Sequence, residues 1–527
     1  MARLKGLFRN QEGAVAVQFA LLALPLCVLA FGLMDVNRAT VAKQQLQDAL
    51  DAATLLAART TTATTDTALT AVGQPALSAN LTNLAGGTLS SSSFHLNGSY
   101  IDSTATVQLT PIVANLWMSG NMNITATSEV VRTMDDLEVA MVLDNTGSMG
   151  STLGSTTKIT ALKTAASSLV DTLAAAAANS TDPNAVKYAV VPFSMTVNVG
   201  SSYSNASWIT GVQPTSSGYT AGTAKDNFDV ANTNRFTLLT QMGLSWGGCV
   251  ESRPYPYDVQ DTAPDPGTPD TMFVPFFAPD EPDSGKTSYT ANNNWNTNDK
   301  TTPTNLSTWR GRLMSTAKYA STNKSNITSA GKTAGHGPNE GCATAPLLRL
   351  TTSASTAKTT LNSMVAIGNT NVAMGLMWGW HVLSPNTPFA DGVAYGTAHH
   401  DKIVILLTDG DNTNSSNSNP DGSIYTGLGY ISQGRLVDTN HTPLTASSTD
   451  TDRMNAIDGR ELALCANMKA QRIIIYSIGV GVSAHSKGLL QTCASGTDHY
   501  YDVTDASQLT TVFNAIAGSI QNLRLSR

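Results

Sequence analysis

The pattern of apolar and polar positions separates an N-terminal hydrophobic segment from the rest of the chain. From Gly13 to Met34 (GAVAVQFALLALPLCVLAFGLM) there is no charged residue. These about 22 residues are enough for a helix to cross a hydrocarbon core of roughly 30 Å. Residues 36–60 contain no glycine or proline and are rich in Ala, Leu and Gln, with apolar residues at helical spacing. We therefore expect a transmembrane helix at 14–35 that continues as a helical stalk.

Basic residues set the expected orientation of this helix. Arg3, Lys5 and Arg9 precede the apolar run, so residues 1–13 should stay in the cytoplasm and the bulk of the chain should lie outside it. A cleaved signal peptide is the alternative interpretation. The run is long for a signal peptide and no A-x-A site follows it closely. We expect a single-pass protein of a bacterial inner membrane.

Two regions further along the chain have weaker patterns. Residues 61–133 begin as a Thr/Ser-rich stretch and end, from Phe94 to Arg132, in alternating apolar and polar residues. They predict a small β-rich linker unit. Residues 201–345 are dense in Ser, Thr, Asn, Asp, Pro and Gly, with scattered aromatic residues. We expect an insertion that folds at least in part against its neighbour, with a disordered linker as the alternative.

The remaining regions, 134–200 and 346–527, alternate strand-like and helix-like segments. The strand-like segments are 138–143, 186–193, 402–407 and 472–480, and the helix-like segments are 158–178, 372–383, 461–470 and 508–520. Strands that alternate with helices predict an α/β domain with a mostly parallel, doubly wound sheet.

Composition and cysteine content favour an exported protein. Charged residues make up 13% of the 527 residues, well below the roughly 25% of soluble domains. The net charge of −7 gives no basic footprint for nucleic acid. Cys27 lies in the apolar run, and the other four cysteines are compatible with two disulfides in an oxidising compartment. We favour Cys249–Cys342 and Cys465–Cys493, in which each pair shares a local region.

Oxygen-bearing side chains follow two of the predicted strands and precede a predicted helix. Asp144, Thr146 and Ser148 have D-x-T-x-S spacing directly after one strand, Thr370 lies before the helix at 372–383, and Asp409 follows the strand at 402–407. Ligands of α/β proteins gather at the carboxyl ends of strands. Hard oxygen donors without imidazole or thiolate favour Mg²⁺, with Mn²⁺ or Ca²⁺ possible, over zinc or copper.

These residues together resemble the metal ion-dependent adhesion site of the von Willebrand factor A (vWA) family. That resemblance implies a Rossmann-like fold in which the hydroxyls of Thr146, Ser148 and Thr370 bind the ion directly. It also implies that Asp144 and Asp409 act mainly through water, and that an Asp or Glu carboxylate of a protein partner fills an open coordination position. Thr146 stands where the family usually has Ser, and it keeps the hydroxyl.

The N-terminal segment carries a second resemblance. The stretch RNQEGAVAVQFALLALP, followed by DVNR and LQDALDAA, is similar to the start of TadE/TadG-type assembly proteins of the Tad (tight adherence, Flp) pilus. Gln18 stands where pseudopilin-like members have Glu, so we expect an uncleaved anchor. The resemblance implies a Tad pilus-assembly or secretion component whose partners are pilus proteins. A general cell-surface adhesin or envelope anchor is the alternative.

Enzyme signatures are weak in this sequence. His399 and His400 precede a strand and predict a solvated strand start, and no H-E-x-x-H or G-x-S-x-G occurs. Gly285-Lys286-Thr287 and Gly331-Lys332-Thr333 lack the upstream glycine of a phosphate loop. We therefore expect no nucleotide and no catalytic residue, with a hydrolase as a remote alternative.

Overall fold

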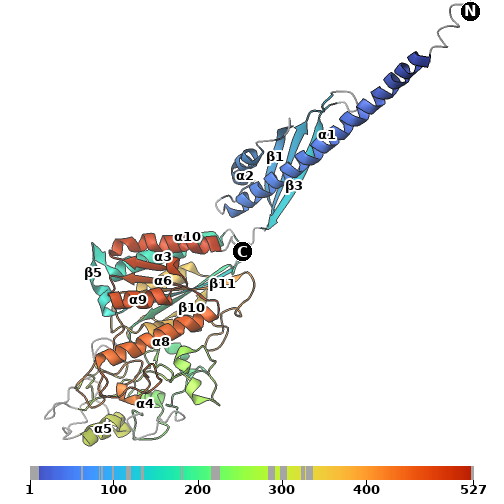
Figure 1. Ribbon diagram of the computed structural model, residues 1–527. Coiled ribbons are helices and arrows are strands. Elements are labelled where there is room, and N and C mark those ends of the chain that lie inside the picture. Colours follow the sequence, from blue (N-terminus) through green and yellow to red (C-terminus); the bar gives the residue numbers. More distant parts are fainter. Residues whose placement is uncertain are drawn as a thin grey trace, which may run out of the picture. The chain divides into compact units, whose positions relative to one another are not determined.

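The computed structural model describes residues 11–60, 63, 65–81, 84, 87–97, 100–113, 120–131, 136–178, 180, 182–214, 226–282, 291–296, 306–321, 327 and 336–523. The chain divides into two compact units, Met1–Met134 and Asp135–Arg527 (Figure 1). The phosphate-loop-like segments at 285–287 and 331–333 lie outside the described residues.

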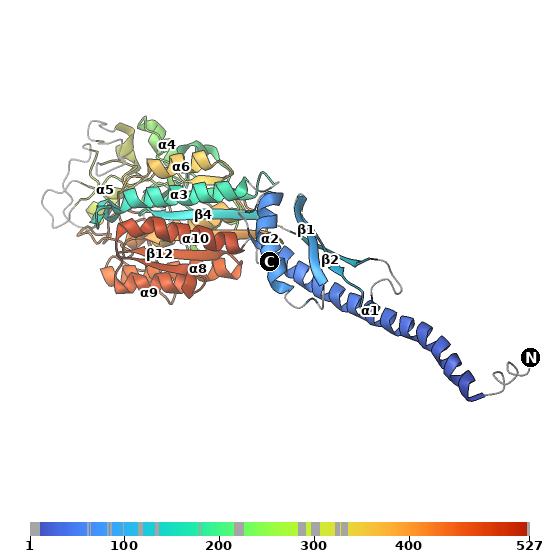
Figure 2. The same cartoon turned by 90° about the horizontal axis from the view of Figure 1, so that it is seen from above.

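Among its described residues, the first unit has one long helix, a short helix and three strands. They are α1 (Gln11–Arg59), α2 (Asp66–Asn80), β1 (Gly87–Asn97), β2 (Tyr100–Leu109) and β3 (Met122–Val131). The strands form an antiparallel sheet in the order β1-β2-β3. The C-terminal half of α1 runs along this sheet, and its N-terminal half extends beyond it, as Figure 2 shows.

The expected stalk is therefore part of a folded unit, which corrects the picture of a helix followed by a separate β unit. Leu46, Leu50, Ala53 and Ala57 of α1 are fully buried, in the same hydrophobic cluster as alternate residues of the three strands. A sheet has to bury its hydrophobic face against another element, and α1 provides that cover. Pro25 lies inside α1.

The helix α2 lies in the stretch that has no clear sequence pattern. Its Thr65 N-cap accepts a hydrogen bond from Ala68 N at 3.2 Å, while Gly73 and Pro75 lower its helix propensity. A Cβ at Gly73 would lie 2.5 Å from Cζ of Phe94. The absence of a side chain there lets α2 pack closely on β1.

Among the described residues, the second unit contains an eight-stranded sheet with the path β13-β12-β11-β4-β7-β8-β9 and β10 beside β7. The strands are β4 (Asp136–Asp144), β7 (Val186–Phe193), β8 (Val197–Asn198), β9 (Cys249–Val250), β10 (Leu348–Thr351), β11 (His400–Thr408), β12 (Ile474–Val480) and β13 (Tyr500–Val503). A short hairpin pairs β5 (Thr152–Leu153) with β6 (Thr156–Thr157). The five strands from β13 to β7 along the path are parallel, which confirms the prediction of a mostly parallel sheet.

Helices cover both faces of this sheet (Figure 1). On one face lie α3 (Lys158–Ala177), α6 (Ala354–Ser363) and α10 (Leu509–Leu523). On the other lie α7 (Val372–Leu383), α8 (Asp450–Ala470) and α9 (Ala484–Cys493). Successive residues of β4 and β11 point to opposite faces and are apolar on both, as expected for strands buried between two helix layers.

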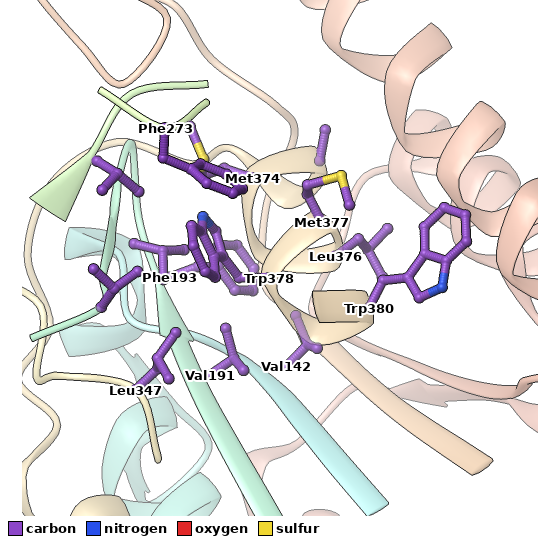
Figure 3. Close-up of a cluster of buried hydrophobic side chains, with 14 of the residues drawn as sticks. Val142, Val191, Phe193, Phe273, Leu347, Met374, Leu376, Met377, Trp378 and Trp380 are labelled. Atoms are coloured by element: carbon purple, nitrogen blue, oxygen red, sulfur yellow. The ribbon is translucent and has the colours of Figure 1, made fainter. Parts of the chain in front are cut away.

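Described parts of residues 201–345 pack on α7. This region includes the short helices α4 (Arg235–Gln241) and α5 (Leu306–Met314). Figure 3 shows Trp378 of α7 in a buried cluster with Phe193 of β7 and Phe273 of the 201–345 region. The ring centroids of Phe273 and Trp378 are 4.8 Å apart, and Trp208 lies 5.7 Å from Phe273. These aromatic residues bury α7 and make its surroundings a continuous core.

The structure contains the two disulfides favoured from the sequence, Cys249–Cys342 and Cys465–Cys493. The first joins two parts of the 201–345 region, and the second joins α8 to the end of α9. Cys27 is a free thiol and is exposed on α1.

The expectation of a solvated strand start at His399 and His400 is wrong for His400. His399 is exposed, with a φ of 56°. His400 is the first residue of β11. Its side chain is buried, with Nε2 at 3.4 Å from Oε1 of Glu138. Because Asp136 is the neighbour of His400 in the parallel ladder, Glu138 two residues later lies within reach of this imidazole.

Candidate functional site

Asp144 lies at the carboxyl end of β4, where its carboxylate is fully buried. One oxygen, Oδ1, accepts a hydrogen bond from Thr146 N at 2.8 Å. The other, Oδ2, accepts one from the Thr408 hydroxyl at 2.7 Å and one from Asp409 N at 3.4 Å. β4 and β11 are parallel neighbours with Leu143 opposite Leu407. This register brings the ends of the two strands, and hence Asp144 and Asp409, together.

A chain of hydrogen bonds connects the predicted ligands of the loop after β4 (the first loop) with Asp409 in the loop after β11 (the third loop). Thr146 Oγ1 and Ser148 Oγ are 3.0 Å apart, and Ser148 Oγ donates to Oδ1 of Asp409 at 2.6 Å. Thr146 and Asp409 are buried, whereas Ser148 is exposed. The chain therefore reaches from a buried carboxylate to the surface of the unit.

The second loop, which carries Thr370, is fixed to the first by backbone hydrogen bonds. Gly147 N donates to Gly368 O at 2.9 Å, and Ile367 N donates to Asn145 O at 2.7 Å. The side chain of Asn145 accepts from Val365 N at 3.1 Å and donates to Val365 O. Asn145 thus holds the two loops together, a role that its position inside the D-x-T-x-S motif did not reveal.

Thr370 lies at the same edge of the sheet but is not in the hydrogen-bonded chain that the structure gives for the other four residues. A Cβ at Gly410 would lie 3.9 Å from Thr370 Oγ1, so this hydroxyl is next to the residue that follows Asp409. Thr413 N donates to Thr370 O at 2.9 Å. The three predicted loops therefore meet at one place.

Two carboxylates in this buried position repel each other. Burial, followed by the negative charge of Asp409, raises the pKa of Asp144 to about 6. Hydrogen bonds from Thr146 and Thr408 act in the opposite direction. At neutral pH the site therefore holds two negative charges in a place that favours an added cation.

The protein itself supplies one positive charge at this site, the ammonium group of Lys158, which the sequence analysis did not predict. Lys158, the first residue of α3, donates from Nζ to Oδ2 of Asp409 at 2.9 Å. Its side chain is 12% exposed and that of Asp409 is buried. Lys158 lies ten residues after Ser148, at the start of the helix expected at 158–178, and this closeness to the motif was a usable signal.

The residues present fit a hard divalent cation. Asp144, Thr146, Ser148, Thr370 and Asp409 offer oxygen donors only, and two of them carry negative charge. The described residues contain no cluster of three or more His, Cys, Asp or Glu side chains that could hold a metal. A metal at this edge would therefore rely on hydroxyl groups and water beside the two carboxylates, a donor set that suits Mg²⁺ better than a soft ion.

A second polar cluster, around Asn412, fixes the loop after β11. Asn412 Oδ1 accepts from Val372 N at 2.8 Å, and its amide donates to Asp458 at 2.9 Å and to Glu461 at 2.8 Å. Burial raises the pKa of Glu461 to about 7. Asn412 thereby ties the loop after β11 to the start of α7 and to α8.

The N-terminal half of α1 has the length and composition of a membrane span. Within the described residues, the helix segment Val17–Arg59 contains an apolar window with a mean hydropathy of 2.3, none of which is buried. Phe19, Leu21 and Leu26 are among its most exposed side chains. Apolar surface of this kind is stable in lipid and costly in water.

Comparison with known proteins places a family match on this same helix. Residues 13–54 match the family model described as TadE-like protein. No curated protein matches the chain in sequence.

Solved structures of pilus proteins are similar to the chain at low identity. The pilus adhesin SpaC from Lactobacillus rhamnosus GG is 13% identical, with a TM-score of 0.32, over 83% of this chain and 34% of that one. The vWF domain of the type V pili tip protein Mfa5 from Porphyromonas gingivalis is 11% identical, with a TM-score of 0.33, over 75% of this chain and 97% of that one. The adhesive tip pilin GBS104 from Group B Streptococcus agalactiae is 12% identical, with a TM-score of 0.33, over 74% and 100%. The chain thus spans about a third of the length of the SpaC structure.

Proposed function

We propose that residues 134–200 and 346–527 form a vWA domain, with 201–345 as an insertion, that binds a protein partner through a divalent cation. The observation that carries this proposal is the hydrogen-bonded chain from Asp144 through Thr146 and Ser148 to Asp409. A doubly wound sheet with helices on both faces supports the same fold.

The ion would be held by Asp144, Thr146, Ser148, Thr370 and Asp409, and we propose Mg²⁺, with Mn²⁺ or Ca²⁺ as substitutes. When bound, it would supply positive charge for an Asp or Glu carboxylate of the partner. Ser148, which is an exposed residue, marks where the partner would approach. The proposed activity is adhesion-type binding and not catalysis.

The TadE-like match at 13–54 supports a place in a Tad pilus-assembly or secretion system. In this proposal α1 anchors the chain once in the bacterial inner membrane, with the N-terminus in the cytoplasm and the second unit outside it. The partners would then be pilus or pilus-assembly proteins.

The test is a calorimetric titration of Mg²⁺ and Mn²⁺ into the full chain in detergent. We expect saturable binding, and Ser148→Ala should weaken it about tenfold, or about 1.4 kcal/mol, because one ligand hydroxyl is lost. Thr146→Ser keeps the hydroxyl and is the matched control, which should bind as the wild type does. Wild-type protein that takes up neither ion would refute the proposal.

Replacing Lys158 should have the opposite effect on the same titration. Its ammonium group neutralises Asp409, so a bound divalent ion has to share this carboxylate with a positive charge. Lys158→Met should therefore tighten Mg²⁺ binding about tenfold, or about 1.4 kcal/mol. Lys163→Met is the matched control, since Lys163 lies on the same helix and donates to Asn362 O. Equal effects of the two variants would mean that only the overall charge matters.

A further inference from the structure

The turn after β2 is attached to α1 through a buried carboxylate. Ile112 N donates to both oxygens of Asp35, at 3.0 Å and 3.2 Å. Arg38 Nη1 donates to Asp35 Oδ1 at 3.1 Å and to Thr110 O at 3.3 Å. Asp35 is fully buried. Residues 110–113, which we call the Asp35 loop, are thus held against one turn of the helix.

That turn is the place where the apolar run ends. Gly13–Met34 contains no charge, and about 22 residues at 1.5 Å each span about 33 Å, close to the thickness of a hydrocarbon core. Asp35 follows Met34 directly, so it would lie at the edge of the core. Its charge is offset by Arg38 and by a backbone N–H, which suits a position where the dielectric constant begins to fall.

The Asp35 loop presents an apolar side chain at this level. Ile112 is 44% exposed, while Pro111 beside it is buried. Val36, one residue beyond Asp35, is 54% exposed. The apolar surface of the helix therefore continues to the height of the loop, and Ile112 adds to it from a different element.

A second contact fixes the direction of the sheet along the helix. The hydroxyls of Thr54 and Ser103 are 2.5 Å apart and both are buried. Asp35, early in α1, contacts Ile112 after the end of β2, whereas Thr54, later in α1, contacts Ser103 near the start of β2. The strand β2 therefore runs antiparallel to α1. The Leu109 end of β2 therefore lies toward the apolar run, and the Tyr100 end lies roughly 30 Å away along the strand.

We propose that the Asp35 loop is a lipid-contact site, in which Ile112 inserts into the interface of the bilayer that α1 crosses. The proposal rests on the membrane anchoring proposed above. Its partner is a phospholipid surface, because the loop lies at the end of the span and continues its apolar surface. The first unit would then contact the membrane at two places, through the spanning part of α1 and through the Asp35 loop.

The experiment uses nitroxide labels on the full chain in vesicles of phosphatidylethanolamine with phosphatidylglycerol as the minor component. Three labelled proteins are compared: native Cys27, Ile112→Cys with Cys27→Ala, and Tyr100→Cys with Cys27→Ala. Ile112 and Tyr100 are both 44% exposed, so Tyr100 is a matched control at the far end of the same strand. The measurement is the accessibility of each label to oxygen, which concentrates in lipid, relative to a water-soluble nickel complex.

We expect the label at position 112 to have an oxygen-to-nickel ratio several-fold above that at position 100 and below that at Cys27. Equal ratios at positions 112 and 100 would overturn the lipid contact. A water-accessible label at Cys27 would instead overturn the anchoring itself. Adding Asp35→Ala to the Ile112→Cys protein should move the label toward water while circular dichroism stays unchanged. An unmoved label would show that Asp35 does not hold the loop at the membrane.

Discussion

Asp144→Asn is expected to weaken Mg²⁺ binding to the full chain by at least about 100-fold, which corresponds to about 2.7 kcal/mol. The substitution removes one of two negative charges from a buried site, where attraction to a divalent ion is worth several kcal/mol. Relief of the repulsion between Asp144 and Asp409 stabilises the metal-free variant and therefore does not offset this loss of binding. Asparagine keeps the shape of the side chain and an acceptor for Thr146 N.

The same argument predicts that the Asp144→Asn protein folds. Relief of repulsion with Asp409 favours the metal-free fold, so circular dichroism and the unfolding midpoint without metal should match or exceed those of the wild type. Asp498→Asn is the control for loss of one surface carboxylate, since that side chain is 82% exposed. If folded Asp144→Asn bound Mg²⁺ as tightly as Asp498→Asn, Asp144 would not belong to the site.

Glu138→Ala is expected to lower the free energy of unfolding of the second unit by about 3–5 kcal/mol, the usual cost of leaving a buried charge without its partner. Glu138 is buried on β4 and forms an ion pair with Lys402 of β11. Lys187 of β7 lies 3.5 Å away on the other side. Lys402 Nζ also donates to Leu383 O at 2.8 Å. Without Glu138, this buried ammonium group would keep that hydrogen bond but lose the carboxylate that neutralises it.

The effect of Glu138 should also depend on pH. Burial alone would raise the pKa of Glu138, but the hydrogen bond with His400 and the charge of Lys402 outweigh it and hold the pKa below the ordinary value. A carboxyl whose pKa is lowered on folding stabilises the fold above its unfolded pKa of 4.5, and this stabilisation is lost as the pH falls. The gap between wild type and Glu138→Ala should therefore be full at neutral pH and shrink in acid.

Urea unfolding followed by tryptophan fluorescence measures this gap, because Trp295, Trp309 and Trp378 are buried in the second unit. Removing Lys402 as well, in Glu138→Ala with Lys402→Met, should recover part of the loss, since the buried Lys402 ammonium group is removed together with its partner. A loss below about 1 kcal/mol for Glu138→Ala, within the range of an exposed ion pair, would contradict the ion-pair argument.

The two predictions concern opposite ends of β4. Asp144 at the carboxyl end contributes charge that an added cation would neutralise, at a cost to the empty fold. Glu138 near the amino end is neutralised by the protein's own cations and contributes stability. The ion pairs of Glu138 thus stabilise β4, and the same strand positions Asp144 beside Asp409 in the candidate site.

Local sequence patterns determined the elements of this protein. The uncharged run at 13–34 lies within α1, and the apolar segment before Asp144 and the segment at 402–407 became β4 and β11. The helix expected at 372–383 has the same bounds as α7. Helix and strand periods repeat within a few residues, so the information for these elements is contained in the segment itself.

Contacts between distant segments decided the rest. The packing of the three-stranded sheet on α1, the helix α2 around Gly73, and the buried state of His400 all depend on residues far away in the chain. Lys158 reaches Asp409 from 251 residues away, and Asn145 holds Val365 across 220 residues. Which side chains lie within hydrogen-bonding distance depends on strand order and register. These are fixed by the packing of the whole sheet and not by the pattern of any one strand.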